Sequence, residues 1–295
     1  MKKALLLVNP KSGKQAAKKY FFDIVNNLSE KYEVTVHLTK STEDLVESAR
    51  TTAFTRVIVC GGDGTLSGAV SGILQNPNRE KIRIGYIPSG TANDVATTLG
   101  IPKTMAAAAQ YVTKHSAKPH DIGLFNDRSF VYTASFGTFA RVAFETPQNM
   151  KNLLGNFAYL LSGAQELLKI KGYDLTLEVD GKVMEKKDIT FFSVSNSHSL
   201  GGGVLRLPSD RVGLDDGKLE LLLIARPKHL IDLENIVRSI AQKEFNNEYV
   251  TLLKAKEIKV RSSAPMSFTL DGEDGGEHTE VTIRCLEGGI NLVKA

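Results

Sequence analysis

The first 120 residues alternate short apolar runs with segments whose apolar residues recur at helical spacing. The apolar runs are brief and show no polar alternation, which is typical of strands buried on both faces of a parallel sheet. We therefore predict a doubly wound, mostly parallel α/β domain. The expected strands and helices occupy, in order, residues 3–8, 17–28, 32–38, 42–50, 56–60, 65–74, 82–87 and 104–115.

After about residue 121 the pattern changes to strands with few helices. Residues 173–179 alternate apolar and polar side chains, and Asp180-Gly181 then supplies a hairpin turn. We predict a β-sandwich-like second domain, with an α/β domain over 1–123, a β-rich domain over 124–295, and a C-terminal segment that is a candidate for packing back on the first domain. Further strands are expected at 130–135, 189–195, 218–225, 258–261, 266–270 and 281–285, and helices at 148–171 and 229–244.

Positive charge is concentrated at the start of the chain. The net charge is +4, from 37 basic and 33 acidic residues, and the first 20 residues hold six lysines and no acid. Such a cluster favours an anionic partner, either phosphates or a membrane surface, although a solvated helix face remains an equal alternative. No basic stripe interleaved with aromatic residues accompanies it, so a nucleic acid is not expected as a partner.

The remaining composition indicates a cytoplasmic protein, soluble or peripheral at the inner face of a membrane. Cys60 and Cys285 are far apart and form no spaced set with histidines, which argues against a disulfide scaffold, a zinc site or a redox motif. The early apolar stretch 4–8 is too short for a signal peptide, and no apolar run approaches the roughly 20 residues of a membrane span. The six histidines are scattered and pair with no obvious acid, so we expect surface or core roles.

A glycine-rich run, Gly61-Gly62-Asp63-Gly64-Thr65, directly follows the apolar strand 56–60 and opens a helix. Glycine lets the backbone approach a bulky anion, and a helix N-terminus adds N–H groups and partial positive charge. A tight turn alone explains two glycines at most, and the acid between them would repel phosphate unless a cation intervened. The run fits neither the dinucleotide-binding nor the Walker pattern. We predict a nucleotide-phosphate and Mg²⁺ site.

Two further loops follow strands in the same way. They are Asn9-Pro10-Lys11-Ser12-Gly13, after the first strand, and Pro88-Ser89-Gly90-Thr91-Ala92-Asn93-Asp94, after the strand 82–87. Each alone is typical of a turn. Ligands of open parallel sheets collect at the carboxyl ends of the strands, so three such loops at one edge indicate a shared site.

Two acidic turns lie in the second half, and each has two interpretations. Asp271-Gly272-Glu273 is either a solvated β-turn or a carboxylate held to take a proton from a substrate hydroxyl. The run from Gly213 to Lys218, which contains Asp216, is either a hairpin corner or a hard-cation site built from carboxylate and carbonyl oxygens.

These motifs, in this order and spacing, resemble the diacylglycerol kinase catalytic family. The likeness continues through Asp121-x-Gly123, Ala134-Ser-Phe-Gly137 and Asp216-Gly217, so it covers essentially the whole chain. The resemblance implies ATP and Mg²⁺ as cofactors, Glu273 as the proton acceptor, and Asp63 and Asp94 as organisers of Mg²⁺ and phosphates. Asp271 is a candidate for orienting the turn and the next catalytic candidate after Glu273. The resemblance also implies a separate Mg²⁺ on the Asp216 carboxylate and the carbonyls of Gly213 and Lys218. The implied ATP contacts are Asn9, Pro10, Lys11, Ser12, Gly13, Thr39, Gly61, Gly62, Asp63, Gly64, Thr65, Leu66, Ser67, Gly68, Gly90 and Thr91.

The implied activity is transfer of the γ-phosphate of ATP to the hydroxyl of diacylglycerol, a membrane lipid, to give phosphatidic acid. The alternatives are a kinase of another lipid alcohol (a sphingoid base or a polyprenol), a NAD kinase, or a nucleotide- or lipid-binding regulator without catalysis. The presence of Asp63, Asp94 and Glu273 argues against the regulator. A second copy of the chain, forming a homodimer, is a further candidate partner.

Overall fold

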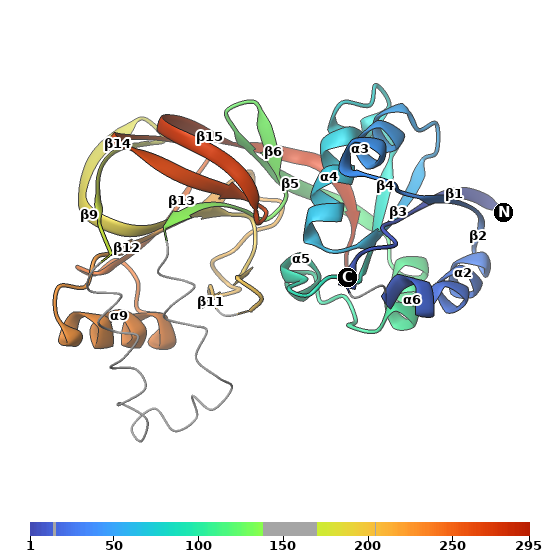
Figure 1. The fold of residues 1–295 in the computed structure, drawn as a ribbon, viewed down its shortest axis with the longest axis horizontal. Helices are drawn as coiled ribbons and strands as arrows, with labels where there is room; N and C mark the ends of the chain where they lie inside the picture. The colour runs from blue at the N-terminus through green and yellow to red at the C-terminus, as the bar shows by residue number, and fades with distance from the viewer. Residues whose placement is uncertain (14–15, 138–169, 204) are drawn as a thin grey trace, which may run out of the picture. The chain divides into compact units, whose positions relative to one another are not determined.

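The computed structural model describes residues 1–13, 16–137, 170–203 and 205–295, which form two compact units (Figure 1). The first unit holds Met1–Tyr132, Leu214–Gly217 and Leu286–Ala295, and the second holds Thr133–Gly213 and Lys218–Cys285. The first unit thus runs past residue 123, where the sequence analysis placed the boundary, and includes the C-terminal segment. The helix predicted over 148–171 lies almost entirely outside the described residues.

The first unit is built on a parallel sheet. Its strands follow the order β2 (Tyr32–Leu38), β1 (Lys2–Val8), β3 (Arg56–Gly61) and β4 (Arg83–Pro88), all parallel. The end of β15 (Glu273–Val293) continues it, with Leu292 paired in parallel with Ile84. Beyond β15 the sheet is extended by β5 (Ala117–Phe125) and β6 (Arg128–Phe130).

Helices cover both faces of this sheet, which explains why β3 is buried from Val57 to Gly61. One pair is α3 (Thr42–Thr51) with α4 (Asp63–Leu74), and the other is α2 (Phe21–Ser29) with α6 (Met105–Lys114). Figure 1 shows the two pairs on opposite sides of the strands. The shorter elements are α1 (Ala16–Lys19), the 3₁₀ helix η2 (Arg79–Lys81) and α5 (Asp94–Thr98). The doubly wound α/β prediction is confirmed.

The second unit is antiparallel, with two long strands that each serve two neighbours. Both β9 (Lys182–Ser195) and β14 (Glu257–Leu270) pair with β8 (Tyr173–Val179) along one part and with β7 (Thr133–Gly137) along another. These four strands therefore close into a ring, which the sequence analysis did not predict, within an antiparallel, β-rich unit, which it did. On the outer side of β9 lie β12 (Leu219–Ala225) and then β13 (Val250–Ala255). The remaining elements are β10 (Ser199–Leu200), β11 (Leu205–Arg206) and α9 (Leu230–Gln242).

Aromatic rings fill the core of the second unit. The rings of Phe136 and Phe192 stack with centroids 5.1 Å apart, and Phe268 meets Phe136 edge-on, also at 5.1 Å. Such burial and ring geometry stabilise the packing of β7, β9 and β14. The predicted turn at Asp180-Gly181 joins β8 to β9 with both residues at positive φ, 48° and 80°, as a type I′ hairpin requires.

Candidate active site

The loops after β1, β3 and β4 are joined at the carboxyl edge of the first unit's parallel sheet. The backbone N–H of Asn9 donates to the carbonyl of Cys60 at 2.9 Å, and its side-chain Nδ2 donates to Thr65 Oγ1 at 3.0 Å. The N–H of Ser89 donates to the carbonyl of Gly61 at 2.7 Å. The structure therefore brings together the three loops that the sequence analysis assigned to a shared site.

Glycines let these loops pack backbone against backbone. A Cβ on Gly62 would lie 3.2 Å from the Cα of Gly90, and a Cβ on Gly90 would lie 2.6 Å from the Cα of Gly62. At Gly13, where φ is +52°, a Cβ would lie 1.6 Å from the carbonyl oxygen of Ser89. A side chain at any of the three positions would force the loops apart. The edge is consequently lined by main chain, which can approach a phosphate closely.

The start of α4 suits a nucleotide phosphate as well. Gly62 is the N-cap of α4 and provides no side-chain hydrogen bond to the helix. The first turn of a helix presents N–H groups and partial positive charge to an anion. The backbone-lined edge and the helix start together fit the phosphates of a nucleotide, which is the group that the sequence analysis placed here.

Members of the predicted nucleotide loop differ in what they contact. The side chain of Leu66 is fully buried in the core. A Cβ on Gly68 would lie 3.0 Å from Leu45 of α3, so that glycine permits α3 and α4 to pack closely. A Cβ on Gly61 would lie 2.3 Å from the side chain of Thr65. Thr91, in contrast, is exposed.

Asp63 links the start of α4 to the start of α5. Its Oδ2 accepts the N–H of Asp94 at 3.0 Å and its Oδ1 accepts the N–H of Val95 at 3.3 Å. Both aspartates are buried, with Asp63 8% and Asp94 1% exposed. A carboxylate that accepts the first N–H groups of a helix acts as a cap from outside the helix. Asp63 therefore holds the loop after β4 in place.

Tyr86 of β4 forms a hydrogen bond to the same carboxylate, that of Asp63. Its hydroxyl donates to Asp63 Oδ1 at 3.5 Å. Burial, with the negative charge of Asp63 as the second cause, raises the pKa of the Tyr86 phenol well above its usual value of 10. The phenol thus remains protonated and keeps its proton available to the carboxylate.

Asn93 closes the loop after β4, although the sequence analysis gave it no role. Its Oδ1 accepts the N–H of Gly90 at 3.0 Å, and its Nδ2 donates to the carbonyl of Gly90 at 2.8 Å. Asn93 also adopts the left-handed region, with φ at +53°. Asparagine tolerates that conformation and forms such local turns. Its place in the Gly-Thr-x-Asn-Asp run was the signal for this role.

Thr39 joins the loop after β2 to β1. Its N–H and its hydroxyl both donate to the carbonyl of Val8, at 2.9 Å and 3.1 Å. Val8 directly precedes Asn9, so Thr39 lies beside the loops described above.

The nearby Cys60 thiol is buried, and burial raises its pKa to about 12, so it is protonated and unreactive at neutral pH.

In the second unit, Asp271 and Glu273 occupy different environments. Asp271 and Gly272 form the two-residue turn between β14 and β15, with φ of +51° and +85°. Asp271 is 5% exposed, its N–H donates to the carbonyl of Thr133 at 2.8 Å, and its Oδ1 accepts the N–H of Thr133 at 3.0 Å. Glu273 is exposed. Asp271 therefore fixes the turn, and Glu273 presents its carboxylate to solvent.

Asp121 holds the loop that carries Asp216. Within the first unit, its Oδ2 accepts the N–H of Gly217 and its Oδ1 accepts the N–H of Gly288, both at 2.7 Å. Its own N–H donates to the carbonyl of Leu214 at 2.9 Å. The sequence analysis noted Asp121 only as part of a motif. Because it is fully buried and binds backbone on two segments, it is an organising residue for this loop.

A divalent cation in the run from Gly213 to Lys218 would be bound by oxygen. A carboxylate and two carbonyl groups are hard ligands of the type that Mg²⁺ prefers, so the donor set fits the ion that the resemblance implies. Over the described parts of the chain, no three His, Cys, Asp or Glu side chains are grouped closely enough to hold a metal.

Five of the six early lysines are described, Lys14 lying outside the described residues, and these five do not form one patch. Lys2 and Lys3 begin β1, whereas Lys11 follows its carboxyl end, and about 20 Å of strand separates Lys2 from Val8. Lys18 and Lys19 precede α2, whose far end leads into the start of β2 at the amino edge. The beginning of α2 consequently lies at the carboxyl edge with Lys11. The sequence cluster thus divides between two edges of the sheet.

Both parts of the chain are similar to known families and proteins. Residues 3–125 match the family described as Diacylglycerol kinase catalytic domain, and residues 132–294 match the YegS C-terminal NAD kinase beta sandwich-like domain. The diacylglycerol kinase of Bacillus subtilis (strain 168) is 31% identical over 281 residues, which cover 94% of this chain and 91% of that protein. The diacylglycerol kinase of Staphylococcus aureus (strain JH9) is 33% identical over 281 residues, with 94% and 87% covered. A solved structure from Bacillus anthracis str. Sterne has a TM-score of 0.80 and 27% identity, and covers 100% of this chain and 95% of its own.

Proposed function

Because the chain belongs to the diacylglycerol kinase family, we propose that it transfers the γ-phosphate of ATP to the free hydroxyl of diacylglycerol. The family predicted from the motifs is confirmed, and membership implies ATP binding. The observation that carries the proposal within the structure is the backbone-lined carboxyl edge, where Gly13, Gly62 and Gly90 pack beside the start of α4. Such an edge suits the phosphates of ATP.

Phosphoryl transfer requires the protein mainly to align the reacting groups and to neutralise the charge on the phosphates. The lipid hydroxyl oxygen bonds to the γ-phosphorus, the bond to the β,γ-bridging oxygen breaks, and ADP leaves. Glu273 would accept the hydroxyl proton. Asp63 and Asp94 would organise the phosphate loops, and Mg²⁺, when bound with ATP, neutralises charge on the phosphates.

Transfer of label from γ-labelled ATP tests the reaction class. With Mg²⁺ and mixed micelles, diacylglycerol, sphingosine, a polyprenol and NAD are offered separately. We expect label in phosphatidic acid above that of a heat-treated control. Label only in the sphingoid, polyprenol or NAD product would assign the chain to the corresponding alternative, and the absence of any labelled product would contradict the kinase proposal.

The Asp216 loop would hold a structural Mg²⁺ through the Asp216 carboxylate and the carbonyls of Gly213 and Lys218. A ligand that binds only the folded state stabilises it by about 2.7 kcal/mol at 100 times its Kd. We expect Mg²⁺ to raise the melting temperature of the wild-type protein and to lose this effect in Asp216→Ala. The matched control is Asp215→Ala, which removes the 3.0 Å pair with Lys294 but keeps the proposed ligands. A melting temperature unchanged by chelator in the wild type would contradict the metal site.

Peripheral binding to an anionic membrane is proposed through the start of α2. Phe22 is 85% exposed, and Lys18 and Lys19 lie just before Tyr20, the N-cap residue of α2. Separately, no helix among the described residues is long and apolar enough to cross a membrane. An apolar ring beside lysines is suited to a membrane surface, where each lysine contributes about 1 kcal/mol.

In liposome sedimentation at low salt, Lys19→Ala combined with Phe22→Ser should weaken binding to anionic vesicles by about tenfold. Lys2→Ala combined with Lys3→Ala, at the opposite edge, is the control and should bind as the wild type does. Equal sedimentation of the wild-type protein with neutral and anionic vesicles would remove the proposal.

A further inference from the structure

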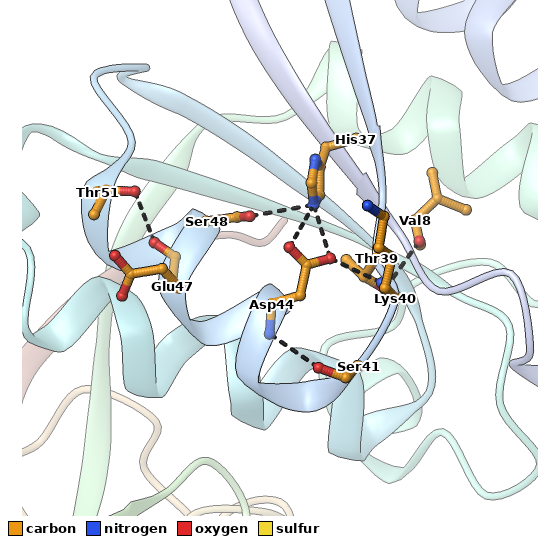
Figure 2. A network of polar contacts seen from close by, with 9 residues as sticks. All are labelled: Val8, His37, Thr39, Lys40, Ser41, Asp44, Glu47, Ser48 and Thr51. Atoms are coloured by element: carbon orange, nitrogen blue, oxygen red, sulfur yellow. Dashed lines mark hydrogen bonds and ion pairs between the residues drawn. The ribbon is translucent and has the colours of Figure 1, made fainter.

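A small polar network surrounds the residue that follows β2 (Figure 2). His37, near the end of β2, places its Nε2 3.1 Å from Asp44 Oδ2 and 3.2 Å from Asp44 Oδ1. Asp44 Oδ2 also accepts the backbone N–H of Lys40 at 2.8 Å. One carboxylate on α3 thus binds the chain on both sides of Thr39. The expectation that the histidines pair with no acid was wrong for His37, because the two partners belong to different elements.

The carboxylate is itself fixed by the start of α3. Ser41 is the N-cap of α3, and its hydroxyl accepts the N–H of Asp44 at 3.2 Å. The Lys40 N–H first, and His37 after it, hold the pKa of the Asp44 carboxyl below its usual value. Asp44 is therefore ionised at neutral pH. It therefore binds the loop from the first turn of α3, whose N-terminus is capped by Ser41.

The network includes a serine, a histidine and an aspartate, but its geometry excludes a hydrolytic triad. Ser48 Oγ lies 3.2 Å from His37 Nε2, the same ring nitrogen that meets Asp44. A triad needs the aspartate on one ring nitrogen and the serine on the other, so that the histidine can take the serine proton. The arrangement here can only fix the ring and the loop.

What the network holds in place is Thr39. The N–H and the hydroxyl of Thr39 both donate to the carbonyl of Val8. Asn9, which follows Val8 in the chain, donates from its side-chain Nδ2 to Thr65 Oγ1 at 3.0 Å. A continuous series of bonds therefore runs from Asp44 through Thr39 to the loops after β1 and β3. A shift of Thr39 would be transmitted to the edge that takes the phosphates.

We propose that Asp44, oriented by His37, is a positioning residue that fixes Thr39 for nucleotide binding. The inference rests on the proposed function, since it takes Thr39 as an ATP contact. Because Asp44 binds the chain on both sides of Thr39, we expect its removal to act on the affinity for ATP. The lipid site and the chemical step keep their residues.

Four variants separate this role from general stability. Asp44→Ala removes both bonds to the loop and should raise the KM and the calorimetric Kd for ATP by about tenfold, since hydrogen bonds to a charged group are strong. His37→Ala leaves the Lys40 bond and should raise both by about threefold. Asp44→Asn keeps an acceptor for the Lys40 N–H and should restore affinity to within about twofold of wild type. Glu47→Ala breaks an exposed pair with Arg50 at 2.7 Å on the same helix, and is the matched control with wild-type affinity.

The outcomes are distinct. An ATP affinity in Asp44→Ala and His37→Ala equal to that of the wild type overturns the inference, as does an equal loss in Glu47→Ala. An equal rise in the KM for lipid also overturns it, because that result would indicate a general structural effect. His37→Ala and the calorimetric Kd keep the test decisive if Asp44→Ala does not fold. Failure of the wild type to phosphorylate diacylglycerol contradicts the proposed function, whereas its ATP Kd still tests the positioning role.

Discussion

Glu273→Gln should lower kcat by about 10²- to 10⁴-fold, equivalent to roughly 3–5 kcal/mol in the barrier. A lipid hydroxyl is a poor nucleophile at neutral pH, and a carboxylate that accepts its proton assists as the bond to phosphorus forms. The environments of the two candidate acids favour Glu273, which is exposed, over Asp271, whose buried carboxylate accepts the N–H of Thr133 in β7. Glutamine keeps the shape and removes the basicity, so ATP affinity and melting temperature should change little.

Steady-state and single-turnover kinetics on diacylglycerol micelles measure this effect. Glu277→Gln is the matched control, because Glu277 is another exposed glutamate of β15, bonded by the Ser267 hydroxyl at 3.0 Å. It should retain wild-type kcat. If Glu273→Gln keeps more than about a tenth of wild-type kcat while chemistry limits the rate, the base is elsewhere, and Asp271 is the next candidate.

Local patterns predicted the elements whose residues determine their own conformation. The strand Tyr32–Leu38 and the Asp180-Gly181 turn were predicted at their observed positions, since periodicity and positive-φ residues are local signals. The two short strands predicted at 258–261 and 266–270 are one strand, β14, because its pairing with β15 continues on both sides of a register shift between Arg261 and Met266. The joining of the two segments into one strand depends on pairing with another segment of the chain, which a local sequence pattern does not show.

The predictions for the site divide in the same way. The three glycine loops were placed at one edge by a general property of parallel sheets, and they are joined there. The contact between His37 and Asp44 depends on how α3 packs against β2, and the bond from Asp121 to Gly288 spans 167 positions. The division of the lysine cluster follows from the length of β1. These three features, the His37–Asp44 contact, the Asp121–Gly288 bond and the division of the lysines, can be deduced only once the fold is known.

Asp63→Asn should weaken ATP binding by about ten- to a hundredfold and lower the free energy of unfolding by about 1–3 kcal/mol. Each oxygen of the wild-type carboxylate accepts a backbone N–H, one from Asp94 and one from Val95. An asparagine offers a single oxygen, so its amide NH₂ would face one of these N–H groups in a buried position. The N-terminus of α5 would then separate from the start of α4, and the loops would lose the spacing that their glycines permit.

Chemical denaturation and calorimetric titration of ATP measure the two effects on Asp63→Asn. Tyr86→Phe is the control, because it removes only the phenol that meets Asp63 at 3.5 Å and leaves both backbone bonds intact. It should lower stability by less than about 1 kcal/mol and leave ATP affinity near that of the wild type. Stability lost in Asp63→Asn with ATP affinity unchanged would show that the joined loops are structural and do not form the phosphate site. Both quantities unchanged would contradict the capping role itself, because a buried donor facing a donor cannot be neutral.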